Sequence, residues 1–262
     1  MKTKLHQFLF SFACLFLFIS FSAVFAGDFQ SAQDFFNRKD YETARKLWAH
    51  LAEAGHSSAQ YSLGVMYAEG YGVSRNYKKA LKWYRLAAEQ GDGKAQTNLG
   101  WIYERGKGVP RDSQKAAKWY LLAAEQGFAN AQYNLGVLYF SGDGVQRDDK
   151  EAVKWYRLAA EKGLTNAQTS LGEMYQNGYG IQRDYDEAIK WHNLAAEQGN
   201  PIASFRLGVI YYHGDEVLQD YKEAIKFFKI ATERNFAKAQ YYLGFMHAEG
   251  LGVSQNYKQA VK

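Results

Sequence analysis

The stretch Ala-Gln-Tyr-Ser-Leu-Gly at residues 59–64 decides the fold, because variants of it return at one fixed interval. The shared pattern Ala-x-x-x-Leu-Gly begins again at Ala95, Ala131, Ala167, Ala203 and Ala239, each 36 residues after the one before. Self-similarity at a constant period of this length is the signature of an array of short supersecondary units that stack on one another. The sequence therefore predicts a repeat protein.

Each unit is expected to contain two helices. In the first helix, Ala59, Leu63 and Met66 recur at helical spacing and place one apolar stripe on a single face. Gly64 lies in the middle of this helix, where glycine costs up to about 1 kcal/mol relative to alanine. Its repetition predicts that a neighbouring helix approaches closely at this position. The equivalent glycines are Gly100, Gly136, Gly172, Gly208 and Gly244.

The sequence also marks where the helices begin and end. A glycine permits the left-handed backbone that closes a helix, and an asparagine or aspartate can accept a hydrogen bond from an amide of the first turn. First helices are predicted to end at Gly70, Gly106, Gly142, Gly178, Gly214 and Gly250, and second helices to start after Asn76, Asp112, Asp148, Asp184, Asp220 and Asn256. A capping box is predicted in four units, completed by Glu151, Glu187, Glu223 and Gln259.

The second helix combines large aromatic side chains with small ones. Trp83 and Tyr84 precede the pair Ala87 and Ala88, and the helix is predicted to end at Gly91. The tryptophans are expected to pack in the core, although exposed tryptophans could form a carbohydrate platform. The equivalents of Trp83 are Trp119, Trp155, Trp191 and Phe227, and the equivalents of Gly91 are Gly127, Gly163, Gly199 and Asn235.

Four segments organise the chain. Residues 1–26 form a predicted signal peptide, 28–58 an amino-terminal capping helix pair, 59–238 five repeats and 239–262 an incomplete sixth repeat. Because the sixth repeat lacks the tryptophan, the alanine pair and the closing glycine of the second helix, either the native protein continues beyond this sequence or the final helix frays and leaves an apolar face partly bare.

Residues 1–26 have the parts of a secretory signal. Lys2 and Lys4 precede an apolar stretch from Leu5 to Phe21, and small residues surround a cleavage point predicted after Ala26. The alternative is an uncleaved membrane anchor, which would be the protein's sole membrane attachment. Lipidation at Cys14 is disfavoured by the residues before it. We expect a periplasmic or secreted protein without disulfides, since Cys14 is the single cysteine.

The charge balance disfavours nucleic-acid binding. The formal net charge of +5 comes from 32 basic and 27 acidic side chains, and removal of Lys2 and Lys4 lowers the basic count to 30. A nearly balanced chain lacks the concentrated positive charge that nucleic-acid binding requires.

The repeated residues resemble a known family. The pattern Ala-x-x-x-Leu-Gly-x-x-Tyr-x-x-Gly-x-Gly-Val, followed by Ala-x-x-Trp-Tyr-x-x-Ala-Ala-Glu-Gln-Gly, is similar to the Sel-1-like repeat, a relative of the tetratricopeptide repeat, and the copy from Ala59 to Lys94 matches every element. The resemblance implies an all-α fold, a right-handed α/α solenoid of helix-turn-helix repeats. It also implies an adaptor for membrane-associated or envelope complexes; exported bacterial members serve host-cell entry, exopolysaccharide export and envelope signalling. Glu216, in place of the second loop glycine of the fifth repeat, predicts a distorted loop.

Partner binding is expected on the concave face, which first helices line in such solenoids. The positions equivalent to Ser62, Val65 and Glu69 form one stripe and differ between repeats, although ordinary solvated positions also vary. Trp101 and Arg105 are favoured because aromatic and arginine side chains often dominate interfaces. The predicted partner-binding residues are Asn98, Trp101, Arg105, Asn134, Glu173, Asn177, Arg206 and His213.

The motifs of catalysis are weak or missing in this sequence. The Gly70-x-Gly72 loop follows no strand, so a turn explains it better than phosphate binding, and there is no Gly-x-Ser-x-Gly motif. The histidines of the predicted mature chain lack the spacing of metal ligands. We therefore predict a scaffold for a protein or peptide, without enzymatic activity, cofactor or metal. The alternative is a module that binds peptidoglycan or exopolysaccharide, and the oligomeric state stays open.

Overall fold

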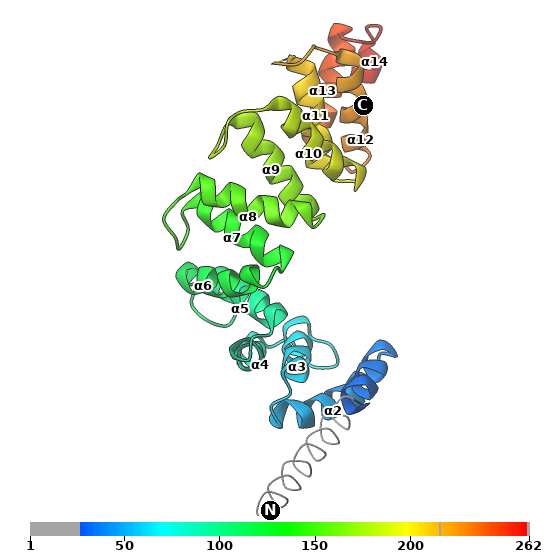
Figure 1. Cartoon of the computed structure of the whole chain (residues 1–262). Helices are drawn as coiled ribbons and strands as arrows, with labels where there is room; N and C mark the ends of the chain where they lie inside the picture. Colours follow the sequence, from blue (N-terminus) through cyan, green and yellow to red (C-terminus); the bar gives the residue numbers. More distant parts are fainter. Residues whose placement is uncertain (1–26, 215, 261–262) are drawn as a thin grey trace, which may run out of the picture. The chain divides into compact units, whose positions relative to one another are not determined.

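The computed structural model describes residues 27–214 and 216–260, and all regular secondary structure in these ranges is helical (Figure 1). The predicted signal segment, with Cys14 and the cleavage point after Ala26, lies outside the described residues. Residues 27–37 form the first described helical segment. The chain divides within α6 into two compact units, the first ending at Ala123 and the second beginning at Ala124.

The helices alternate between the first and second positions of the repeat, and nearly all are thirteen residues long. Their bounds are α2 Tyr41–Glu53, α3 Ser57–Glu69, α4 Tyr77–Glu89, α5 Gly93–Arg105, α6 Ser113–Glu125, α7 Ala129–Ser141, α8 Asp149–Glu161, α9 Thr165–Asn177, α10 Tyr185–Glu197, α11 Pro201–His213, α12 Tyr221–Thr232, α13 Ala237–Glu249 and α14 Tyr257–Ala260. The odd-numbered helices from α3 to α13 are the first helices of their repeats. The predicted all-helical repeat fold is confirmed.

The repeated glycines lie under aromatic rings. A β-carbon built on Gly64 would come within 2.4 Å of the ring of Tyr84, a second-helix residue, and one built on Gly100 would come within 2.7 Å of Tyr120. The close approach predicted for this position is therefore made by an aromatic side chain that lies flat against the backbone of the first helix. In the third, fourth and fifth repeats the ring belongs to Tyr156, His192 and Phe228, whereas Gly244 of the sixth repeat faces the backbone oxygen of Ala260.

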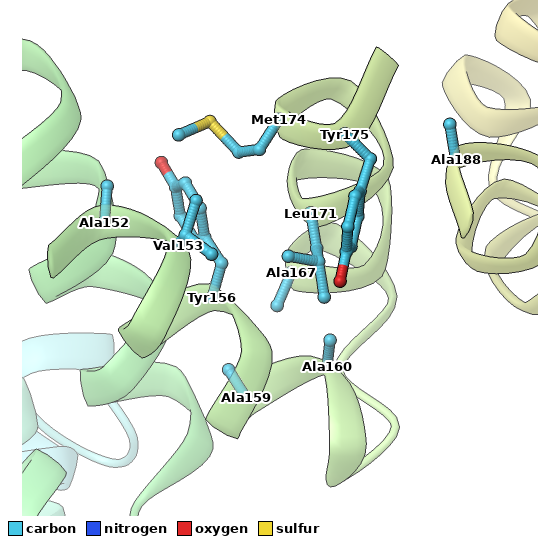
Figure 2. Close-up of a cluster of buried hydrophobic side chains, with 10 residues drawn as sticks. All are labelled: Ala152, Val153, Tyr156, Ala159, Ala160, Ala167, Leu171, Met174, Tyr175 and Ala188. Carbon is cyan, nitrogen blue, oxygen red and sulfur yellow. The ribbon is translucent and has the colours of Figure 1, made fainter. Parts of the chain in front are cut away.

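The cores of the two units are built from these contacts. In the first unit, Trp48, Leu63 and Met66 are buried and pack against aromatic side chains of residues 27–37. In the second unit, Figure 2 shows Tyr156 of α8 facing Leu171 and Met174 of α9. Alanines on each second helix complete the contact, because they leave room for the rings.

Of the four repeat tryptophans, Trp155 is buried as predicted, and the other three are less buried than predicted. Trp83, Trp119 and Trp191 are half-buried, whereas the aromatic residue that follows each of them fills the core. The reason is helical spacing: Tyr84, one position on, faces the glycine of the first helix, so Trp83 is turned toward the edge of the helix. Lysines cover these exposed ring faces, as with Lys82, whose Nζ lies 4.9 Å from the Trp83 ring centroid.

The helix ends follow the sequence signals. Gly70 has φ +83° and Gly91 has φ +89°, and Asn235 takes the same left-handed conformation with φ 57°. Glu216 also has φ 57°, so this residue adopts the left-handed backbone of the glycine that it replaces.

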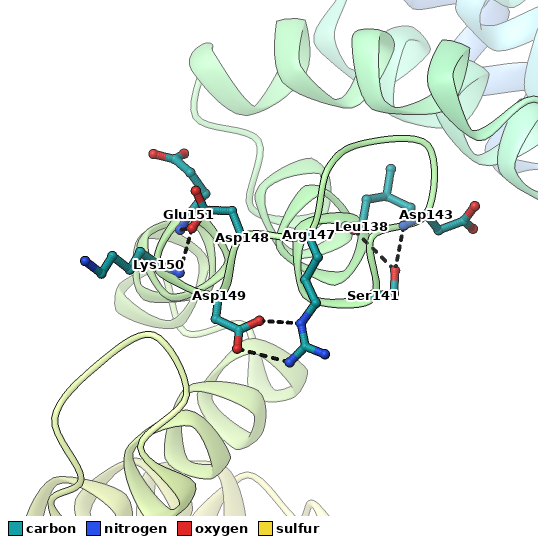
Figure 3. Close-up of polar contacts among 8 residues, drawn as sticks. All are labelled: Leu138, Ser141, Asp143, Arg147, Asp148, Asp149, Lys150 and Glu151. Atoms are coloured by element: carbon teal, nitrogen blue, oxygen red, sulfur yellow. Dashed lines mark hydrogen bonds and ion pairs between the residues drawn. The ribbon is translucent and has the colours of Figure 1, made fainter.

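The predicted N-caps of the second helices also form. Figure 3 shows the cap of α8, where an Asp148 carboxylate oxygen accepts hydrogen bonds from the amides of Lys150, at 2.9 Å, and Glu151, at 3.1 Å. The Glu151 carboxylate in turn forms an ion pair with Lys154. Arg147, just before the helix, donates two hydrogen bonds to the Asp149 carboxylate.

A buried glutamine ties each of the first helices α3, α5, α7 and α9 to the helix before it. The Gln60 side chain donates to the backbone oxygen of Ala52 at 3.0 Å, and Gln96, Gln132 and Gln168 repeat the bond to Ala88, Ala124 and Ala160. The Gln90 and Gln198 side chains add amide–amide hydrogen bonds to Gln60 and Gln168. Sequence reasoning missed this contact, although the repeated Ala-Gln pair was its signal.

Candidate functional site

The predicted partner-binding residues all lie on first helices, namely α5, α7, α9 and α11. Trp101, Arg105, Asn177 and His213 are exposed, and Asn98, Asn134, Glu173 and Arg206 are half-buried. The alanine, leucine and glycine at the packed positions of these helices recur from unit to unit, whereas the accessible stripe varies. The structure groups some of them and separates others.

A hollow in the first unit brings Asn98 and Trp101 together. Its volume is about 240 Å³, and its walls come from three successive helices of the repeat array. It is lined by Ala68 and Glu69 from the end of α3, Tyr84 from α4, and Asn98, Trp101 and Ile102 from α5. Trp101 is 37% exposed, and its ring centroid lies 6.2 Å from that of Tyr77.

Tyr84 gives the hollow a neutral hydroxyl group. The side chain is buried, and burial is the main reason why its pKa lies well above the ordinary value of 10. The neighbouring Tyr61 and the negative charge of Glu69 raise the pKa further, while a hydrogen bond with the Asn98 side chain opposes the rise. The phenol therefore stays protonated at any physiological pH and cannot supply a negative charge.

Glu69 supplies the negative charge of the hollow. Its side chain is exposed and forms no ion pair within the described ranges. Arg75 donates to the backbone oxygen of Glu69 at 3.5 Å rather than to the carboxylate. Arg105, one turn beyond Trp101, is paired with Glu104 at 3.4 Å and does not line the hollow.

The second unit joins two other predicted residues by an ion pair. The Arg206 guanidinium on α11 donates a hydrogen bond from Nε at 2.8 Å to a carboxylate oxygen of Glu173 on α9, and its Nη2 forms an ion pair with the same oxygen at 2.7 Å. Both side chains are partly exposed, and the Asn177 side chain donates to the Glu173 backbone oxygen. No hydrogen bond joins Asn134 or His213 to another of the eight residues in the part of the chain that the structure describes.

A buried histidine lies close to this ion pair. His192 occupies the position held by Tyr84, Tyr120 and Tyr156 in other repeats, it is fully buried, and neither ring nitrogen has a hydrogen-bond partner. Burial first, and the positive charge of Arg206 second, lower the pKa of His192 from 6.5 to about 3. The ring is therefore neutral at physiological pH and serves as packing against Gly172.

Metal and membrane sites are not evident in the described residues. Between residues 27 and 260, residue 215 aside, no three or more histidine, cysteine, aspartate or glutamate side chains gather in a way that could hold a metal ion. None of the helices in these ranges has the length and apolar character needed to cross a membrane.

Paired antiparallel helices repeated in phase, with accessible side chains that vary over a core of recurring alanine, leucine and glycine, define a helical-repeat interaction protein. The model of the Sel1 repeat matches six successive segments, residues 57–92, 93–128, 129–164, 165–200, 201–236 and 237–262. The chain belongs to the Sel1 repeat family, whose members generally mediate protein–protein interactions and are typically non-catalytic.

Solved structures agree with this assignment. A protective antigen present in uropathogenic Escherichia coli strains is 36% identical, with a TM-score of 0.84 over 90% of this chain and 52% of the antigen. A Sel1 repeat protein from Oxalobacter formigenes is 33% identical, with a TM-score of 0.81 over 89% of this chain and 94% of that protein. This chain therefore spans about half the length of the E. coli antigen. A search of curated proteins found no match.

Proposed function

We propose that the protein is an exported scaffold that binds a protein or an extended peptide along its first helices. One observation carries the proposal: the residues equivalent to Ala59, Leu63 and Gly64 are identical in every first helix, whereas the accessible positions on one stripe differ. Packing constrains the recurring residues. A partner that contacts several repeats in sequence requires accessible residues that differ from repeat to repeat. The family's general role in protein–protein interaction supports the same reading.

Export rests on the composition of residues 1–26, with their basic start, apolar middle and small residues before Gly27. The resemblance to an E. coli protective antigen is consistent with a protein that reaches the cell envelope or its exterior. Fractionation of the native cell, followed by amino-terminal sequencing, tests this part. A periplasmic or secreted protein that begins at Gly27 is expected, and a cytoplasmic protein that keeps Met1 would contradict it.

Binding is tested by cross-linking pull-down from the cell envelope and culture fluid with the chain from Gly27 onwards. A saturable protein partner is expected, and Trp101→Ala should weaken its capture. Leu158→Ala is the matched control, because Leu158 lies on a second helix and is also 37% exposed. Equal capture by both variants would contradict a first-helix interface.

The same pull-down tests the alternative function. Trp101 offers an exposed aromatic face of the kind that polysaccharide-binding sites use, so peptidoglycan or exopolysaccharide is the second candidate ligand. Recovery of cell-wall material without a saturable protein, lost in Trp101→Ala, would favour the polymer-binding module over the scaffold.

A further inference from the structure

We propose that the hollow between α3, α4 and α5 binds the side chain of a lysine or arginine from an extended peptide segment of the partner. The inference rests on the proposed scaffold function and names the chemistry of one contact in it. It is carried by three features of the hollow: an unpaired carboxylate, an exposed aromatic face and a volume suited to one side chain.

The electrostatics favour a cation. Glu69 provides a full negative charge at the rim, and this charge is felt inside the hollow, since it contributes to the raised pKa of Tyr84. Trp101 provides an indole, the aromatic ring that attracts cations most strongly. An ammonium or guanidinium group in the hollow would therefore meet a carboxylate and a π-face together. The nearby cations do not occupy the site, because Arg75 binds a backbone oxygen and Arg105 pairs with Glu104.

The size of the hollow favours a side chain over a whole small molecule. Sites for drug-sized ligands have volumes of about 300–1,000 Å³, and this hollow has about 240 Å³. Its lining also suits an aliphatic stem that ends in a charge. Ala68 and Ile102 are apolar, and the polar groups of Glu69, Asn98 and Tyr84 surround them. Lysine and arginine have this construction.

A carboxylate and an aromatic ring combine in this way only between α3 and α5, among the pairs of successive first helices that lie in the same compact unit. Glu69 and Trp101 are the residues that α3 and α5 contribute at two stripe positions. The equivalent residues are Ser141 and Glu173 on α7 and α9, Asn177 and Val209 on α9 and α11, and His213 and Phe245 on α11 and α13. None of these pairs joins a carboxylate to an aromatic ring. The proposed contact therefore sets the register of a peptide along the repeats.

The test is a titration of the chain from Gly27 onwards, which contains all three helices, with short capped glycine–serine peptides. One peptide carries a single central lysine, and the others carry norleucine or glutamate in its place. Binding is measured by calorimetry and by the NMR signal of the Trp101 indole N–H, assigned with Trp101→Leu. The lysine peptide is expected to shift this signal saturably and to bind about two- to thirtyfold more tightly than the norleucine peptide, the range of a cation–π contact.

Matched variants locate the effect. Glu69→Gln and Trp101→Leu should each remove most of the preference for lysine. Glu89→Gln should keep it, because Glu89 is exposed on α4 and its removal changes the net charge equally. Circular dichroism checks that each variant stays folded. Equal affinity for lysine and norleucine, or an unchanged preference in Glu69→Gln, would overturn the inference.

The outcome is separable from that of the scaffold proposal. A captured partner that binds wild type and Glu69→Gln equally would overturn the lysine site and leave the scaffold intact. A lysine preference that depends on Glu69, found in a protein that captures no partner, would support the site and count against the scaffold.

Discussion

Gly64 and Tyr84 are two halves of a single contact. The glycine sits in a helix interior that it disfavours, and the ring of Tyr84 occupies the space that a side chain at residue 64 would need. The same pairing recurs between Gly172 and His192. A residue that weakens its own helix is therefore retained for the packing of the next one.

Gly64→Ala is expected to lower the free energy of unfolding. The added methyl group gains up to about 1 kcal/mol of helix propensity but meets the Tyr84 ring at 2.4 Å, and overpacking of this kind costs about 1–3 kcal/mol. We expect a net loss of about 1–2 kcal/mol by urea unfolding. Ser58→Ala, an exposed change on the same helix, is the control. A more stable Gly64→Ala would mean that the two helices can separate at little cost.

His192 predicts a pH dependence of stability. Its pKa is 6.5 ordinarily and about 3 in the folded chain, so below pH 6.5 the unfolded chain binds a proton that the folded chain does not. The free energy of unfolding therefore falls as pH decreases from 6.5 towards 3, by about 2 kcal/mol between pH 7.5 and 5. The positive charge of Arg206 acts in the same direction.

The variant His192→Tyr isolates this effect, because tyrosine occupies the position in three other repeats. Urea unfolding at several pH values should show that the variant loses less stability between pH 7.5 and 5 than wild type. Parallel pH profiles for the two proteins would show that other groups control the acid response.

At the scale of the helix, glutamine amides join successive elements. Gln60 and Gln90, and Gln168 and Gln198, form amide–amide hydrogen bonds 30 residues apart. In the middle of this series Lys162 replaces the second glutamine, its Nζ bonds to the backbone oxygen of Gly127 instead, and the Gln132 side-chain oxygen is buried without a partner.

Lys162→Gln is therefore expected to stabilise the second unit. The new amide can donate to the unpaired Gln132 oxygen, and a hydrogen bond of this kind contributes about 0.5–1.5 kcal/mol, more than the exposed lysine contact that is lost. Thermal unfolding measures the gain. Arg234→Gln is the control, since the residue 30 positions before it is Ser204, which bonds to Asn200 and has no free amide. A similar gain in both variants would show that charge removal, not the hydrogen bond, is responsible.

The starts of the second helices and the ends of the first helices were predictable because each has its own capping residue, whereas α7, α9 and α13 start without a side-chain cap. Asp148 and Gly142 act on backbone groups within one turn, so local sequence is sufficient. The grouping of Asn98 with Trp101 also followed from one helical stripe. The contributions of Glu69 and Tyr84 were not predictable, because they depend on how α3 and α4 pack against α5. Periodicity alone also does not resolve whether a tryptophan lies in the core, as Trp155 does, or at its edge, as Trp83 does.

At the scale of the molecule, the free energy of unfolding is expected to be approximately a sum of contributions from single repeats and from contacts between neighbouring repeats. The helices contact mainly the next helix in sequence, as α3 does with α4 and α9 with α10. In such an array a repeat senses its neighbours and little beyond them. A destabilising change should therefore have a limited reach.

Hydrogen exchange followed by mass spectrometry measures that reach. Gly64→Ala should speed amide exchange in α3 and α4 and in the adjacent helices, and leave α11 and α12 at wild-type rates, since local openings in repeat proteins need not involve distant units. Uniformly faster exchange along the whole chain would show that the protein unfolds as a single cooperative block.

Because the repeat period is constant at 36 residues, the number of repeats can change by whole units. Each unit presents the same alanines, glycine and leucine to the unit before it and receives the same set from the unit after it. An in-frame loss of residues 165–200 would join Leu164 to Pro201 and let α8 meet α11 through side chains already suited to each other. Recombination between neighbouring repeats in a gene could thus lengthen or shorten the binding surface without a new interface having to evolve.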